Sequence, residues 1–420
     1  MKFLHTSDWH LGRTLYGRSR YDEFSAFLEW LAALIESERV DALLVAGDVF
    51  DSAVPSSRAQ ELYYSFIHKV ARSTICHHVV ITSGNHDSPS FLNAPKALLR
   101  ALDVHVVGSA SEEPTGEVVE LRDSRGVLEA VVCAVPHLRD RDIRSVEAGE
   151  SLEEKSRKLL DGIERHYREV CQAGEVLRQD VGGAVPMVAM GHLFTAGGTT
   201  VDGDGVRELY VGSLAHVSRT IFPAGIDYLA LGHLHVPQRV GGEEHLRYSG
   251  SPLPMGFGEA RQQKEVVLID FLEGERSITQ VAVPLFQPLE RISGSVEAVT
   301  SRIYCLKAEG SSAWLEIEYT GAELPGNLRE LLEEAVKGSS LEIRRIKNNR
   351  LATLVLHQLS EHESLDELGA FDVFERCLNA GKVPDAQRPD LLQAYQEIVL
   401  SLYEDDELPS ATTPLPKQLL

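Results

Sequence analysis

The chain has 420 residues, more than one hydrophobic core usually serves, so we expect two or three domains. A hydrophobic content of 43% and a charged content of 25% are typical of a globular protein with material for a substantial core. The formal net charge of −22 argues against a protein that binds nucleic acid by itself, because phosphate neutralisation needs basic residues. A DNA-binding function would therefore need local basic patches, bound cations or a partner.

The sequence does not support the membrane or secreted classes. No apolar run has the length that a spanning helix requires. The opening residues "MKFLHTSDWHLG" predict a first strand rather than a signal peptide. The five cysteines are scattered and include no CxxC pair, which fits a reducing cytoplasm.

The first part of the chain alternates strand-like and helix-like segments. The runs "KFLHTSD", "DALLVAGDVF" and "HHVVITSGNHD" predict strands, and apolar residues at helical spacing predict helices over 21–40 and 56–71. Strand and helix in alternation predict an α/β layered sheet. Each predicted strand ends in polar residues, and ligand sites in such sheets collect at the carboxyl ends of the strands.

Beyond residue 115 the predicted strands lie closer together, which indicates a second sheet completing a sandwich, with a helical insertion near 151–172. The two prolines of "VAVPLFQPLERISGS" mark a boundary, and a strand, helix, strand pattern follows. The predicted domains are a core over 1–285, a small α/β capping domain over 286–350, helices over 360–405 and a disordered tail over 406–420.

Five polar clusters stand at the ends of predicted strands, four of them beside a glycine that allows a sharp turn. They are Asp8 with His10; Asp48; Asn85 with His86 and Asp87; His192; and His233 with His235. Carboxylate, amide and imidazole ligands together suit Mn²⁺, Fe or Zn²⁺, and the lack of thiolates argues against a structural zinc site. A single cluster of this kind is more often a cap or a core residue, but five in order predict a metal site.

The stretch "LALGHLH" leaves two interpretations open. His233 and His235 could be satisfied core imidazoles at the end of a buried strand, or part of a metal site. Residues two apart on an ideal strand face the same way, which by itself favours one shared ion.

The motifs "SDWHLG", "AGDVFD", "SGNHD", "MGHLF" and "LGHLH" resemble, in order, those of the calcineurin-like metallophosphoesterases. More narrowly, "HTSDWHLGRTLYGRSRYDEF" and "YSGSPLPMGFGE" resemble the nuclease subunits of SbcCD-type DNA repair complexes. The resemblance implies a four-layer α/β/β/α sandwich with a capping domain and C-terminal helices. It also implies a Mn²⁺-dependent 3′-to-5′ double-strand exonuclease and endonuclease that acts at the nucleoid in repair, recombination and replication.

The resemblance implies two metal ions bridged by Asp48, most simply Mn²⁺, with Mg²⁺, Fe²⁺ or Zn²⁺ as alternatives. One ion would take Asp8, His10 and His235, and the other Asn85, His192 and His233. Sending His233 and His235 to different ions requires the chain to leave strand geometry after Gly232. His86 would contact the phosphate and assist the leaving oxygen. Asp87 would orient a histidine, or else cap the helix that begins near "SPSFLNAPKALL".

Arginines suit phosphate oxygens because of their forked geometry, so two groups are candidates for DNA contact. They are Arg13, Arg18 and Arg20, which surround Tyr16, and Arg139 with Arg141. Ordinary solvated loops are the alternative for both groups.

The resemblance also implies partners. The C-terminal helices would dock on the coiled-coil base of an SbcC-type, SMC-like ATPase, and helices over 56–71 and 90–102 would pair two subunits into a homodimer within a heterotetramer. Packing of these helices on their own sheet is the alternative. An ATPase partner that also binds the DNA would explain how a chain with a net charge of −22 can act on it.

Two further functions remain open. A nucleotide or small-molecule phosphodiesterase would share every metal ligand but would not need the arginines or the C-terminal helices. A non-catalytic scaffold of the ATPase complex would lack ligands, whereas no expected ligand is missing from this sequence.

Overall fold

The computed structural model describes residues 1–143, 150–183, 185–195, 198, 200, 217–272, 274–321 and 327–347, with 374–375, 378–379, 388–389, 391–392 and 395. The chain forms two compact units. The first comprises Met1–Arg291, Cys305–Glu316 and Val336–Arg345, and the second holds Ile292–Tyr304, Ile317–Ala335 and the described residues from Ile346 onward. The C-terminal helices and tail predicted beyond residue 360 lie almost wholly outside the described residues.

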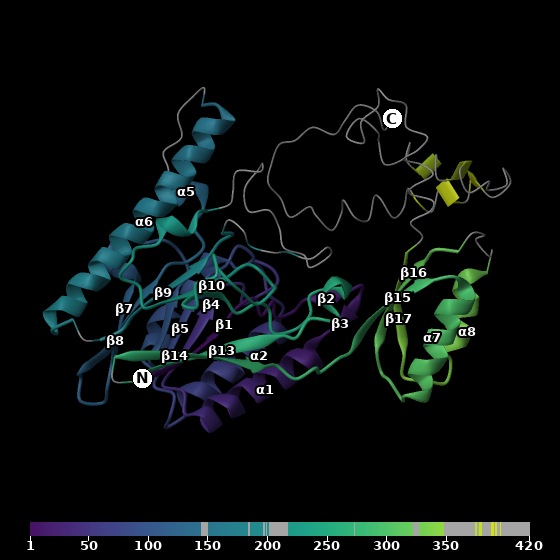
Figure 1. Cartoon of the computed structure of the whole chain (residues 1–420), viewed down its shortest axis with the longest axis horizontal. Coiled ribbons are helices and arrows are strands. Elements are labelled where there is room, and N and C mark those ends of the chain that lie inside the picture. The colour runs from purple at the N-terminus through teal and green to yellow at the C-terminus, as the bar shows by residue number, and fades with distance from the viewer. Residues whose placement is uncertain are drawn as a thin grey trace. The chain divides into compact units, whose positions relative to one another are not determined.

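The first six-stranded sheet has the order β14-β13-β1-β4-β5-β6 and is labelled in Figure 1. Its parallel part is β1 (Lys2–Thr6), β4 (Ala42–Ala46), β5 (His78–Thr82) and β6 (Val104–Val107). The strands β13 (Glu265–Leu272) and β14 (Glu275–Ala282) extend it in antiparallel fashion. The crossover helices α1 (Tyr21–Glu38) and α2 (Ser57–Ala71) follow β1 and β4. The ligand-bearing strands are therefore parallel neighbours, so their carboxyl ends share one edge.

The second six-stranded sheet has the order β11-β12-β10-β9-β8-β7. Its central strands β8 (Leu128–Ala134), β9 (Met187–His192), β10 (Tyr228–Gly232) and β12 (Leu246–Tyr248) are parallel. The outer strands β7 (Val118–Arg122) and β11 (Gln238–Arg239) run antiparallel to their neighbours.

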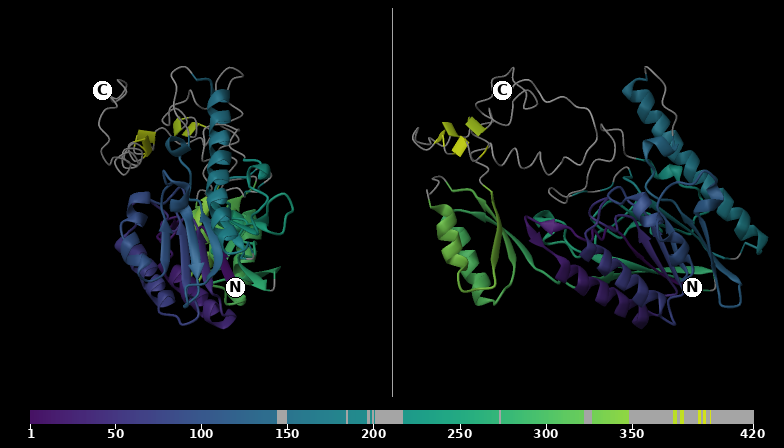
Figure 2. Two further views of the ribbon diagram at one scale, coloured as in Figure 1. Left: turned by 90° about the vertical axis from the view of Figure 1, so that its left-hand side faces the viewer. Right: turned by 180° about the vertical axis from the view of Figure 1, so that it is seen from behind.

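Alternate residues of the central strands, which are buried on both faces, belong to three apolar layers. Residues such as Phe3, Leu44 and Val188 pack between the two sheets. Leu43 and Val79 face α1 and α2, and Met187 and Leu231 face the long helix α6 (Leu152–Asp180). Figures 1 and 2 show α1 and α2 on one side of the two sheets and α6 on the other. The four-layer α/β/β/α sandwich expected from the sequence is confirmed.

The helix α6 begins where the sequence predicts but continues beyond it, to Asp180 rather than 172. Ser151 and Glu154 form a capping box at its start. The helix continues through Gly174, where it packs closely on the second sheet. A Cβ at this position would lie 2.8 Å from Cys133 Sγ, which accounts for the glycine. The helix ends before Gly182 and Gly183, whose φ angles are 91° and 73°.

The helix predicted over 90–102 is divided. The structure has α3 (Pro89–Asn93) and α4 (Lys96–Arg100), with Pro95 between them at the start of α4. Proline has no N–H to continue a helical ladder, which explains the interruption.

The remaining elements of the first 288 residues are short. They are β2 (Thr14–Leu15), β3 (Arg18–Ser19), α5 (Asp140–Ile143) and the 3₁₀ turns η1 (Pro114–Glu117), η2 (Arg219–Ile221) and η3 (Phe257–Glu259). Among the described residues, no helix combines the length and apolar character that crossing a membrane requires.

A three-stranded sheet of order β15-β16-β17 follows, built from β15 (Leu289–Gly294), β16 (Trp314–Tyr319) and β17 (Glu342–Lys347). The helices α7 (Val296–Ala308) and α8 (Leu328–Val336) connect these strands in the sequence. The strand, helix, strand pattern predicted after the proline-rich boundary therefore occurs, preceded by one more strand and helix.

Candidate metal centre

The loops after β1 and β4 carry the first oxygen and imidazole side chains in left-handed backbone conformations. The φ angles of Asp8, His10 and Asp48 are 52°, 48° and 50°. Such conformations cost roughly 1–3 kcal/mol each and persist only where the surroundings hold them. Hydrogen bonds between the two loops do so: Asp8 N–H donates to Gly47 O, and His10 N–H donates to Asp48 O, both at 3.0 Å.

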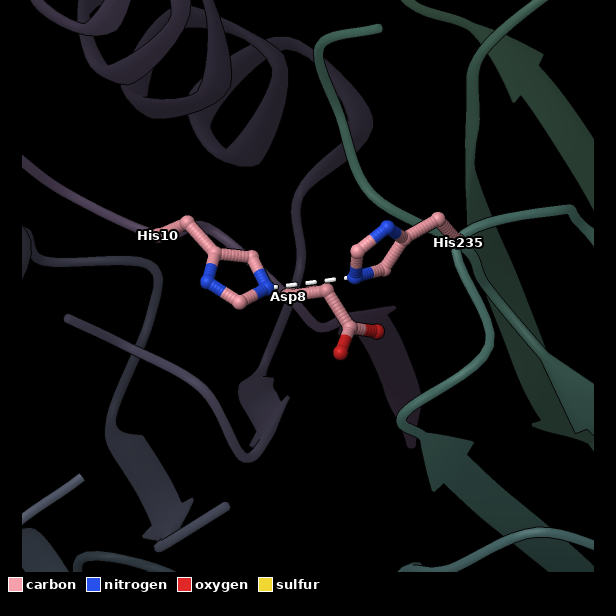
Figure 3. A group of neighbouring side chains, drawn as sticks. All are labelled: Asp8, His10 and His235. Carbon is pink, nitrogen blue, oxygen red and sulfur yellow. Dashed lines mark hydrogen bonds between the residues drawn. The ribbon is translucent and has the colours of Figure 1, made fainter. Parts of the chain in front are cut away.

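Asp8, His10 and His235 form a first group of candidate ligands at the carboxyl edge of the two sheets (Figure 3). One ligand atom of each lies within 4.8 Å of the others. The Nε2 atoms of His10 and His235 face each other at 3.2 Å. The Asp8 carboxylate accepts from Ser7 Oγ at 2.5 Å and from His233 N–H at 2.9 Å, so its position is fixed.

Asn85, His192 and His233 form a second group. Asn85 Oδ1 lies 3.0 Å from His192 Nε2 and 3.2 Å from His233 Nδ1. His233 Nε2 is buried without a hydrogen-bond partner among the described residues. The Asn85 oxygen with the His192 Nε2 and His233 Nδ1 nitrogens turned toward it is a donor set that fits a bound cation.

Asp48 lies between the two groups. Its Oδ2 is 3.3 Å from His192 Nε2 and 3.6 Å from His10 Nε2. The residue is 1% exposed, and its Oδ1 accepts from His86 N–H at 2.8 Å. This central carboxylate therefore contacts a histidine of each group, as a bridging ligand would.

His233 and His235 point into different groups because the strand ends just before them. β10 stops at Gly232, and His233 has a φ of 101°. A Cβ on Gly232 would lie 1.9 Å from Ala46 O, so only glycine allows this close approach of the two sheets. Of the two interpretations of "LALGHLH", the geometry favours a metal site, with the two histidines in different ligand groups.

Neighbouring groups bind the Nδ1 side of His10, His86 and His192, which leaves the Nε2 atom of each as the free ring nitrogen. His192 Nδ1–H donates to Ala46 O at 3.0 Å, and His86 Nδ1–H to Asp51 O at 2.9 Å. Asp51 Oδ1 lies 3.3 Å from His10 Nδ1. Such partners fix the tautomer of a metal-binding histidine and raise its basicity.

Glu259 supports His235 in the same way, with its Oε1 3.7 Å from His235 Nδ1. It is fully buried and paired with Lys264, whose Nζ also donates to His235 O at 3.0 Å. Burial alone would raise the pKa of Glu259, but Lys264 and His235 lower it to about 2. Asp51 and Glu259 were not among the site residues predicted from the sequence, although both stand within the motifs "AGDVFD" and "YSGSPLPMGFGE".

The surroundings of Asp48 shift the pKa values of two neighbouring histidines in opposite directions. Burial alone would lower the pKa of His192, but the adjacent Asp48 carboxylate raises it to about 9. Burial lowers the pKa of His233 well below its ordinary value, and the neighbouring His192 adds to that effect. The concentration of these buried groups in one place is typical of a functional site.

His86 is half-buried and borders the first group rather than the second. Its ring lies 4.8 Å from that of His10, centroid to centroid, and it forms a candidate ligand group with His10 and Asp48. With Nδ1–H held by Asp51 O, its Nε2 remains for a substrate.

The expected roles of Asp87 are wrong. Its carboxylate accepts from the backbone N–H groups of Val49, Phe50 and Gly84 at 3.1, 2.9 and 2.8 Å. The helix α3 is capped by Ser88, whose side chain accepts from Phe91 N–H. Asp87 therefore braces the backbone of the loops after β4 and β5.

The five candidate DNA-contact arginines differ in their surroundings. Arg20 is 1% exposed and pairs with Glu23 at both carboxylate oxygens, so its expected contact with DNA is wrong. Arg13 pairs with Asp51 at 3.2 Å, and Arg139 pairs with Asp142 at 2.8 Å. Arg18 and Arg141 also lie near carboxylates, of Glu342 at 3.2 Å and of Asp142 at 3.8 Å, but their side chains are the more exposed, at 51% and 74%.

Comparison with known proteins places this geometry in a family. The model of the calcineurin-like phosphoesterases matches residues 1–237, and that of the type 5 capsule protein repressor C-terminal domain matches residues 285–381. The chain is 35% identical to the SbcD subunit of the SbcCD nuclease of Escherichia coli K12, covering 97% of this chain and 100% of that protein. The protein of the same name from Bacillus subtilis is 30% identical over the same shares.

The Rhodobacter capsulatus protein of that name is 38% identical, covering 70% of this chain and 71% of that protein. A metallophosphoesterase domain, with carboxylate and imidazole groups gathered at one edge, makes this a divalent-metal-binding protein. The chain belongs to the calcineurin-like phosphoesterase family, and within it to the family of the SbcD subunits of SbcCD nucleases.

Proposed function

We propose that this chain is a metal-dependent DNA nuclease that hydrolyses phosphodiester bonds at the carboxyl edge of the two sheets. The observation that carries the proposal is the convergence there of Asp48 with a candidate ligand group on either side. The relatives named as SbcCD nuclease subunits, matched over nearly the whole chain, supply the substrate class.

The site would hold two ions. Asp8, His10 and His235 would bind one, Asn85, His192 and His233 the other, and Asp48 both. Paired ions roughly 3.5–4 Å apart supply Lewis-acid stabilisation of a phosphodiester and lower the pKa of water toward neutrality. Mn²⁺ suits this mixture of oxygen and imidazole ligands, and the neutral Asn85 amide limits the negative charge that an incoming phosphate meets.

His86 would act on the substrate rather than on the metals. Asp51 O holds the Nδ1–H of this half-buried residue, which leaves Nε2 free for a substrate. A protonated imidazole carries a second N–H on Nε2, which can donate to a phosphate oxygen or to the leaving oxygen. Asp87 contributes by holding the loops that carry Asp48 and Asn85.

DNA binding would depend on a few exposed cations and on a partner. Arg18 and Arg141 are the two exposed candidates for phosphate contact. The net charge of −22 favours sharing the DNA with an SbcC-type ATPase, which the relatives' name associates with this family. We propose a homodimer joined to that ATPase through the segment beyond residue 360, at the nucleoid.

The test is hydrolysis by the full chain, stripped of metal and reloaded with Mn²⁺, of linear double-stranded DNA and of bis-p-nitrophenyl phosphate, with and without the SbcC-type ATPase. Metal-dependent cleavage of DNA is the expected result. Hydrolysis of the small diester without DNA cleavage, even with the ATPase, would indicate a small-molecule phosphodiesterase instead. Failure on both substrates by metal-loaded protein would indicate a non-catalytic scaffold.

A further inference from the structure

A separate cluster of side chains that could bind a metal ion lies at the opposite, amino-terminal edge of the first sheet. His78 begins β5, His105 lies in β6, and Asp103 directly precedes β6. In the parallel register Val80 pairs with His105, which places the two histidines near each other on neighbouring strands. They border a pocket of about 620 Å³, lined also by His77, Lys96, Arg100 and Arg122.

The three side chains are close enough to share an ion. One ligand atom each from His78, Asp103 and His105 lies within 4.8 Å of the other two. Ligand atoms around a tetrahedral Zn²⁺ are about 3.3 Å apart, given bond lengths near 2.0 Å. The ligand atoms would have to move closer together to bind one ion. Asp103 is exposed and His105 only partly buried, so rotation of their side chains can bring this about.

The hydrogen bonding of His78 prepares it for a metal. Its Nε2–H donates to Arg122 O at 3.0 Å, which leaves Nδ1 as the atom with a free lone pair. This Nδ1 atom is buried and has no hydrogen-bond partner among the described residues, and His78 as a whole is only 7% exposed. A histidine that binds a metal commonly donates its other N–H to a carbonyl in this way.

Both imidazoles are neutral near pH 7 and so are available as ligands. Burial lowers the pKa of His105 to about 4, with the neighbouring His78 and the Arg100 guanidinium adding to the effect. Burial also lowers the pKa of His78, against the hydrogen bond to Arg122 O. Asp103 has a φ of 55°, a constrained conformation for a residue that is not glycine.

We propose that His78 Nδ1, Asp103 and His105 bind a Zn²⁺ ion at a site separate from the carboxyl-edge centre. Two imidazoles and one carboxylate are a common three-ligand set for zinc, with the fourth position open to water from the pocket. The ion would join β5 to β6, and the His78 bond to Arg122 O extends that link to β7 of the second sheet. Lys96 and Arg100 would then screen the pocket from further cations.

The experiment counts bound zinc. Full-length wild type, His105→Ala and Asp103→Asn are stripped with chelator, equilibrated with buffered Zn²⁺, desalted and analysed by mass spectrometry for metal per chain. We expect each variant to bind one zinc fewer than wild type. His77→Ala, a histidine of the same pocket outside the ligand group, is the matched control and retains the wild-type count.

An equal zinc count in wild type and both variants would overturn the proposal. Asp103→Asn makes that result decisive, because Asp103 is exposed and the change leaves the fold intact. If the equal count came with binding of inorganic phosphate that Lys96→Ala abolishes, the pocket would be an anion site instead. DNA cleavage is not the readout, so the outcome is independent of the proposed nuclease activity.

Discussion

The two sheets bring different chemistry to the shared edge. The loops of the first sheet carry all the oxygen side chains, Asp8, Asp48 and Asn85, together with the imidazole of His10. The second sheet carries imidazoles alone, His192, His233 and His235. The first sheet uses left-handed conformations at Asp8, His10 and Asp48. In the second sheet His233 has a φ of 101°, whereas His192 still lies within a regular strand. From that strand the His192 imidazole reaches Asp48 and Asn85 of the first sheet.

This difference explains why the site requires the sandwich. Neither sheet holds either candidate ligand group in full, and the groups form only where the two edges meet. Gly232 allows that meeting, because its Cα lies against Ala46 of the first sheet. The apolar layer between the sheets therefore also positions the ligands.

The largest effect is expected for Asp48→Asn, which removes the charge contacted by histidines of both sheets. We predict loss of one or both ions and a fall in phosphodiester hydrolysis of more than about 100-fold, because even indirect partners of metal ligands cost 10- to 100-fold. Metal content and hydrolysis of bis-p-nitrophenyl phosphate measure it. Asp22→Asn, at a fully exposed carboxylate, is the control. Unchanged metal content in Asp48→Asn would exclude a bridging role.

A smaller effect is expected for Glu259→Gln, which acts only on the second-sheet ligand His235. We predict a fall of about 10- to 100-fold in metal affinity or activity, because the amide neither carries the charge that pairs with Lys264 nor raises the basicity of His235. Metal titration measures the change, with Glu265→Gln as the matched control. If Glu259→Gln bound metal with the wild-type affinity, the Glu259 carboxylate 3.7 Å from His235 would not contribute to metal binding.

The smallest effect concerns the polar link between the sheets, where His5 Nδ1 lies 3.0 Å from Tyr228 Oη. Burial lowers the pKa of His5 from 6.5 to about 3. Below pH 6.5 the unfolded chain binds a proton that the folded chain does not, so stability is lost as the pH falls toward 3. Between pH 7 and pH 5 this proton lowers the free energy of unfolding of the wild type by about 2 kcal/mol. Measured by urea unfolding, His5→Gln should lose about 2 kcal/mol less stability than wild type over the same pH range. Equal losses in both proteins would contradict the assignment.

Much of the site could be predicted from the sequence because each ligand follows a recognisable strand. The order of Asp8, Asp48, Asn85, His192 and His233 along the chain therefore indicated a common edge. The support of His235 by Glu259 could not be predicted, since it depends on the tertiary position of a 3₁₀ turn. The burial of Arg20 against Glu23 likewise depends on packing, because an exposed loop arginine has the same local sequence.

The nuclease proposal is tested most directly by DNA cleavage and metal content measured together in wild type and His86→Ala. His86 lies beside His10, half-buried, but is outside the proposed ligand sets. The variant should therefore keep its metal and lose cleavage of linear DNA by about 100-fold or more. Cleavage at the wild-type rate would contradict the role of His86. Absence of DNA cleavage by wild type with its full metal content and the ATPase present would contradict the proposed nuclease itself.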